Sequence, residues 1–126
     1  MGVGGVKDEP DHFREAMAAP ASLPEFKGNV AVVRTEAYWD PELGELEERW
    51  GKVRNRSRAL SKDKSLSQEE REAVLDELKA ELFTPEELAL REMAISNAAY
   101  HYLGSGKILA RIGKAFAEAL HDIEDR

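Results

Sequence analysis

The chain has 126 residues, of which 42% are hydrophobic and 34% charged, and its formal net charge at pH 7 is -7. This length fits one domain that could bury roughly two-thirds of its unfolded surface. The negative charge argues against nucleic acid as the main partner, because that binding needs a cationic face. The lack of cysteine excludes thiolate metal sites, disulfides and cysteine nucleophiles.

The first ten residues, MGVGGVKDEP, read like the end of a buried strand that runs into a glycine-rich loop. We therefore expect a chain cut from something longer. This stretch has neither the basic start nor the apolar segment of a signal peptide, and no window has the apolar length of a membrane span. Residues 12–19 then predict a short helix that stops at Pro20, because proline cannot continue the backbone hydrogen bonds.

The run Asn29–Thr35, NVAVVRT, is rich in β-branched residues and predicts a strand covered on both faces, as in a parallel sheet. Val3–Val6 is the candidate for a second strand. Two strands are too few for an independent α/β core, which again favours a partial domain. If their neighbours are missing, Val30, Val32 and Val33 would form an uncovered strand edge, through which the chain could self-associate.

Residues 41–95 predict an insertion of two or three helices between the strand and the histidine region. Asp40 is placed to cap the first helix, with Pro41 at its first position. Ser67 and Thr84 each precede a glutamate by three residues, which is the pattern of a capping box at the start of the next two helices. In the first helix acidic residues precede basic ones, so we interpret its basic cluster as matching the helix dipole rather than binding a ligand.

The segment Asn97–Leu120 contains the candidate site. His101 lies between two tyrosines, before a Leu-Gly-Ser-Gly turn and the most regular amphipathic helix of the chain. An imidazole titrates near neutral pH and can accept a proton from a hydroxyl, so His101 fits a general base; a structural histidine bonded to backbone is the other interpretation. Ser105 lacks the strand-turn-helix context of a nucleophile. Gly113, inside the helix, predicts tight packing on a sheet.

The runs Tyr100–Ser105, YHYLGS, and Ile112–Ala119, IGKAFAEA, closely resemble the carboxy-terminal segment of SGNH-type carbohydrate esterases of the sialate O-acetylesterase-like family. Phe13–Ala16 and Leu23–Val30 resemble it as well. The resemblance implies an α/β fold, in which this chain is the C-terminal fragment of a three-layer α/β/α, flavodoxin-like sheet. It also implies hydrolysis of O-acetyl esters on sugars by a serine that a histidine activates, and His101 matches that histidine by position.

The chain departs from the family pattern in two respects. The nucleophile block, a Gly-Gln-Ser-Asn-Met-like motif, is absent, as are the middle strands that supply oxyanion-hole donors. The usual acid, three residues before the histidine, falls on Ala98. Asn97 or a carboxylate from elsewhere would then orient the ring, or the enzyme would use a dyad. We therefore expect the chain alone to be inactive, because those elements provide most of the rate enhancement.

The leading hypothesis is thus the C-terminal part of a serine carbohydrate esterase that supplies the base His101. The resemblance implies an acetylated carbohydrate as the partner of the full-length enzyme and a secreted or periplasmic location. We expect no cofactor, metal, nucleic acid or membrane partner. The alternative hypothesis belongs to another class: a small, non-catalytic helical module that binds a partner protein.

Overall fold

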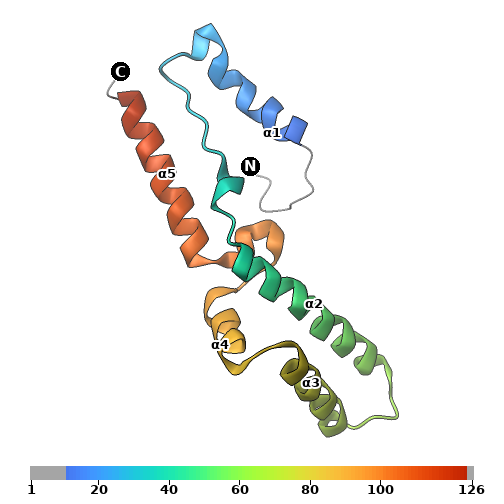
Figure 1. Ribbon diagram of the computed structural model, residues 1–126. Helices are drawn as coiled ribbons and strands as arrows, with labels where there is room; N and C mark the ends of the chain where they lie inside the picture. Colours follow the sequence, from blue (N-terminus) through green and yellow to red (C-terminus); the bar gives the residue numbers. More distant parts are fainter. Residues whose placement is uncertain (1–10, 125–126) are drawn as a thin grey trace. The chain divides into compact units, whose positions relative to one another are not determined.

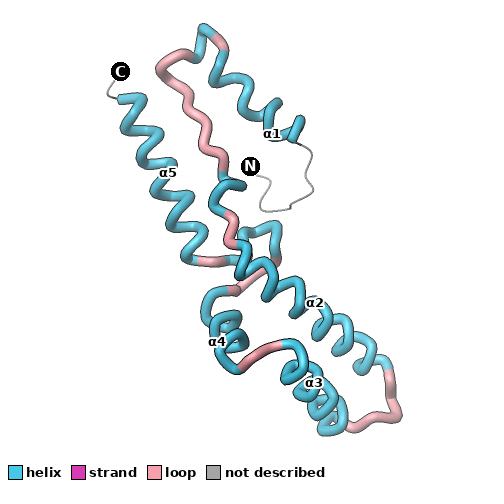
Figure 2. Tube along the Cα trace, viewed as in Figure 1, coloured by secondary structure: helices cyan, strands magenta, loops and turns pink. Residues whose placement is uncertain are grey.

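The computed structural model describes residues 11–124, and within them every regular element is a helix and none is a β-strand (Figures 1 and 2). The α-helices of the described chain are α1 (Asp11–Ala18), α2 (Pro41–Lys62), α3 (Gln68–Leu82), α4 (Pro85–Ala94) and α5 (Gly106–Glu124). Short 3-10 helices stand between them, namely η1 (Ala19–Ser22), η2 (Pro24–Phe26), η3 (Thr35–Tyr38) and η4 (Ala99–Gly104). The chain divides into two compact units, one formed by Asp40–Ser96 and the other by the segments before and after it.

The unit Asp40–Ser96 contains α2, α3 and α4, and each of these helices begins with the cap that its sequence predicts. The Asp40 carboxylate accepts a hydrogen bond from the backbone N–H of Leu43 at 3.3 Å, and Pro41 takes the first helical position. Ser67 and Thr84 both form complete capping boxes with the glutamates three residues later. The predicted starts of these three helices are therefore confirmed.

Helix α2 packs against α3 and α4, and ion pairs reinforce its contact with α4. Arg49 donates to both carboxylate oxygens of Glu87 on α4, at 3.1 and 2.6 Å, and to the carbonyl of Leu82 at 2.8 Å. The buried carboxylate of Glu47 accepts from Arg91 at 2.9 Å and from Arg54. Two of the basic residues of α2 thus bind carboxylates in mid-helix, which the helix dipole alone does not explain, because its influence is confined to the terminal turns.

The prediction of an α/β fold is wrong for the described residues. Residues 30–34 are extended but carry no strand assignment, and they appear as a loop between the helices in Figure 2. A strand requires a neighbouring backbone to complete its ladder, and residues 11–124 offer none. The second predicted strand, Val3–Val6, lies outside the described residues. Residues 11–124 form no sheet, so the strand edge expected at Val30, Val32 and Val33 is not found among them, and self-association stays a prediction.

The other unit contains α1, the extended segment 30–34 and α5. Helix α5 packs against η3 and η4 and buries Ile108, Ile112 and Ala115. Other apolar residues of the predicted face stay exposed, namely Leu109, Phe116 and Leu120. Nothing lies within 4 Å of the position that a Cβ atom on Gly113 would take. The expectations that α5 covers a sheet and that Gly113 marks tight packing on it are therefore wrong.

Candidate functional site

The residues around His101 form a strained turn before α5. Tyr102, Leu103 and Gly104 have φ values of 53°, 61° and 58°, so three consecutive residues occupy the left-handed region. Only glycine adopts this conformation without steric conflict, and such residues cost about 1–3 kcal/mol each unless the surrounding structure imposes them. Backbone strain of this kind concentrates at active sites and ligand-binding loops.

The burial of Leu103 and several hydrogen bonds hold this turn in place. The side chain of Leu103 is fully buried, and the Leu103 carbonyl accepts a hydrogen bond from the backbone N–H of Asn97 at 3.0 Å. The N–H of Leu103 donates to the carbonyl of Ala98 at 3.2 Å. The hydroxyl of Tyr102 is 2.5 Å from that of Thr35, which ties the turn to η3. The fold therefore fixes the backbone on which His101 stands.

His101 itself is exposed at the start of the strained turn. Its ring packs against that of Tyr100, with centroids 4.2 Å apart and planes at 53°. The backbone N–H of His101 donates to the carbonyl of Ala98 at 3.0 Å, whereas no residue between 11 and 124 forms a hydrogen bond with the imidazole. Within the described chain, the imidazole therefore does not make the bond to backbone that a structural histidine would make. Only the main chain of His101 is hydrogen-bonded to these residues.

The neighbouring polar side chains do not complete a catalytic set within the described residues. The side-chain oxygen of Asn97 accepts from the N–H of Ala98 at 2.8 Å, so it stabilises the local turn. The hydroxyl of Ser105 is 1% exposed and has no hydrogen-bond partner among the residues that the structure describes. A substrate ester cannot reach a hydroxyl in that position, so Ser105 is not placed to act as the nucleophile for His101.

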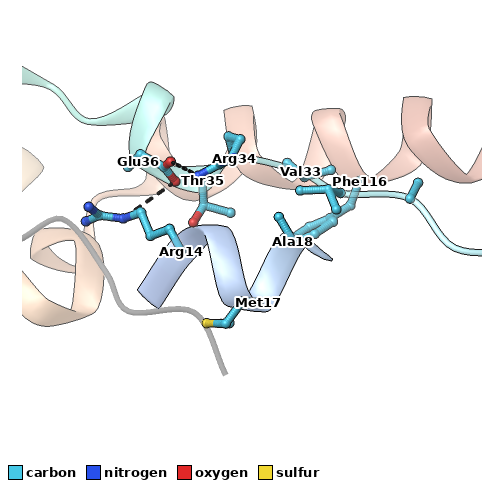
Figure 3. Close-up of a pocket in the computed structure, with 10 residues that line it drawn as sticks. Arg14, Met17, Ala18, Val33, Arg34, Thr35, Glu36 and Phe116 are labelled. Atoms are coloured by element: carbon cyan, nitrogen blue, oxygen red, sulfur yellow. Dashed lines mark hydrogen bonds and ion pairs between the residues drawn. The ribbon is translucent and has the colours of Figure 1, made fainter. Parts of the chain in front are cut away.

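A separate pocket of about 270 Å³ lies between α1, the extended segment and α5, and Phe116 and Met17 form part of its apolar wall (Figure 3). Its charged side chains neutralise one another: Arg34 binds Glu36 at 3.4 Å, and Arg14 lies 3.9 Å from the same carboxylate. The hydrogen bond that Arg34 donates to the Glu15 carboxylate, at 2.5 Å, is the main reason why the pKa of Arg34 is raised. The sequence gives no signal for this pocket, because the pocket is assembled from three distant segments; His101 does not line it.

Within the described part of the chain, no three His, Asp or Glu side chains gather in a way that could hold a metal ion. None of its helices combines the length and the apolar character needed to cross a membrane. Comparisons with known proteins found no match to a family model, to a curated protein or to a solved structure.

Proposed function

We propose that this chain supplies the general base, His101, of a serine carbohydrate O-acetylesterase whose nucleophile lies on another segment of polypeptide. The observation that carries the proposal is the strained turn of Tyr102–Gly104, which the fold anchors and which leads directly from the exposed imidazole. The resemblance of Tyr100–Ser105 to the histidine segment of sialate O-acetylesterase-like enzymes falls on the same residues.

In the proposed reaction the imidazole takes the proton of a serine hydroxyl while the serine oxygen attacks the acetyl carbonyl. The proton then passes to the departing sugar oxygen, which leaves an acetyl-serine ester. Water, deprotonated by the same imidazole, hydrolyses this ester and releases acetate. Ser105 has no part in these steps because its hydroxyl is buried. The sequence lacks the nucleophile block of the family, so the proposal requires a serine from another segment of polypeptide.

The test is hydrolysis of 4-nitrophenyl acetate and of an O-acetylated sugar by the complete natural polypeptide. We expect His101→Gln to reduce kcat/KM by at least a hundredfold, because general bases contribute factors of about 10² to 10⁴. His12→Gln is the matched control, since His12 is also an exposed histidine in the same unit. Equal rates for wild type and His101→Gln, with unchanged circular dichroism, would remove His101 from the mechanism.

The exposed apolar side chains favour a second candidate function, a non-catalytic helical module that binds a partner protein. Large contiguous patches of exposed apolar residues mark interaction surfaces. In the unit that contains α1 and α5 the large exposed side chains are Phe13, Met17, Leu23, Phe26, Val30, Val32, Tyr100, Leu109, Phe116 and Leu120. This candidate predicts that His101→Gln leaves hydrolysis unchanged, so the same assay separates the two functions.

A further inference from the structure

A groove of about 410 Å³ lies between α2 and α3, within the unit Asp40–Ser96, and is separate from the pocket lined by Phe116. Its apolar wall is formed by Trp50 and Val53 of α2 together with Leu75 of α3. Its basic side chains are those of Arg54, Arg58 and Lys79. The volume falls within the range of about 300–1,000 Å³ that is usual for sites of small molecules.

The charge of this groove is opposite to that of the chain. Three of the described residues that line it are basic and none is acidic, although the chain as a whole has a net charge of -7. Arg54 is paired with Glu47, and Lys79 is paired with Asp76 at 2.7 Å. Arg58, in contrast, forms no ion pair with any residue from 11 to 124. The groove therefore contains a cation whose charge the described chain does not compensate.

The position of these cations along α2 is not explained by the helix dipole. Trp50, Arg54 and Arg58 follow one another at intervals of four residues and so share one face of the helix. The dipole favours basic residues in the last turn, where Lys62 stands, and its effect fades within that turn. Arg54 lies two turns before the end, and both arginines face α3. The pair with Glu47 accounts for Arg54, whereas the placement of Arg58 requires another reason.

We propose that this groove binds a small organic anion, in which a carboxylate is joined to a flat apolar body. A guanidinium group presents parallel N–H donors that match the two oxygens of a carboxylate, which would place the anionic end at Arg58. The apolar body then covers Val53, Leu75 and the exposed part of Trp50. This site is independent of the proposed esterase function, because it involves no residue near His101 in sequence.

The experiment is a titration of the full chain with sodium benzoate, followed by the indole N–H signals in ¹H–¹⁵N spectra. Trp39 lies in the other unit and provides an internal reference, and a Trp39→Phe variant assigns the two signals. We expect a saturable shift of the Trp50 signal. Benzamide, which has the same shape without the charge, should bind at least about tenfold more weakly, because a hydrogen bond to a charged group is lost. Sodium sulfate at equal ionic strength should not reproduce the shift.

Substitutions in α2 test which residue of the groove binds the carboxylate of the ligand. We expect Arg58→Gln to weaken benzoate binding about tenfold, whereas Arg56→Gln, an exposed control outside the groove, should leave it unchanged. The proposal is overturned if benzoate produces no saturable shift, if benzamide or sulfate acts equally well, or if Arg58→Gln binds like wild type. The comparison of benzoate with benzamide uses the wild-type chain, so it decides the matter even if a variant fails to fold.

Discussion

Ser67 and Ser105 both stand directly before a helix, yet their hydroxyls are in opposite situations. The Ser67 hydroxyl accepts from the N–H of Glu70 at 3.1 Å, and the Ser67 N–H donates to the Glu70 carboxylate at 2.7 Å. The Ser105 hydroxyl is buried without a partner in the described chain. The difference is visible in the sequence, because Ile108 occupies the position where a capping box needs glutamate or glutamine.

We therefore predict that Ser105→Ala leaves the free energy of unfolding unchanged or raises it by up to about 1 kcal/mol, because it removes a buried hydroxyl that lacks a hydrogen bond. Ser67→Ala, the matched substitution, should lower it by about 1 kcal/mol through loss of the cap. Urea denaturation followed by circular dichroism measures both values. Equal losses for the two variants would mean that Ser105 forms a stabilising bond after all.

The candidate site was only partly predictable at this scale. The sequence places His101 just before the last helix, between two aromatic residues, and the structure agrees on that position and leaves its ring exposed. The strain at Tyr102 and Leu103 could not be predicted, because neither residue type favours a positive φ. It is imposed by the burial of Leu103, by the backbone hydrogen bonds of that residue, and by the bond between Tyr102 and Thr35, which lies 67 residues away.

Between elements, the pair Arg49–Glu87 joins α2 to α4 and makes their contact depend on pH. The hydrogen bond from Arg49 is the main reason why the pKa of Glu87 is lowered, and the bond from the Thr84 N–H adds to it. Because the folded-state pKa lies below the ordinary value of 4.5, this stabilisation is fully present above that value. It is lost as the pH falls through the lower, folded-state pKa.

We thus predict that the urea midpoint of unfolding falls as the pH is lowered from 6 to 3, with the loss concentrated below about pH 4.5. Glu87→Gln should have a lower midpoint at pH 6 and a flatter dependence on pH. The pKa values of Glu70 and Asp63 are lowered as well, by bonds to Ser67 and Ser65 respectively, so some dependence should remain in that variant. A Glu87→Gln curve parallel to wild type would contradict the assignment.

Helix α5 offers a test of whether anything covers its exposed side. Gly113 lies in mid-helix with no atom near its missing Cβ, so Gly113→Ala should raise the free energy of unfolding by up to about 1 kcal/mol. The thermal midpoint measured by circular dichroism should rise accordingly. A lower midpoint would show that another surface packs closely against Gly113.

Element prediction succeeded where the signal was local and failed where it was not. The starts of α2, α3 and α4 follow from side chains that bond to backbone within three residues, so the sequence contains the complete signal. The run Asn29–Thr35 has the composition of a strand, but that propensity reflects packing against neighbours rather than a property of the backbone. Without a paired backbone in the described chain, residues 30–34 are extended and form no sheet.

For the whole molecule, the division into two units implies that Asp40–Ser96 carries its own core and its own polar contacts. The rings of Trp50 and Phe83 are 5.9 Å apart, Arg91 lies 4.0 Å above Trp50, and Arg49 lies 4.9 Å from the centre of Phe83. All four residues belong to this unit. The ion pairs of Glu47 and Glu87 are also internal to it, so its helices share contacts that do not require the rest of the chain.

We predict that a polypeptide of residues 40–96 folds by itself, with a helical circular dichroism spectrum and a cooperative urea transition. So small a unit buries a limited fraction of its surface and is only marginally stable. Phe83→Ala in this segment, which removes about 3 kcal/mol of packing, should therefore abolish the cooperative transition, whereas Arg56→Gln on the exposed face should preserve it. A segment that is helical but unfolds without cooperativity, in both wild type and Phe83→Ala, would show that its core depends on the flanking residues.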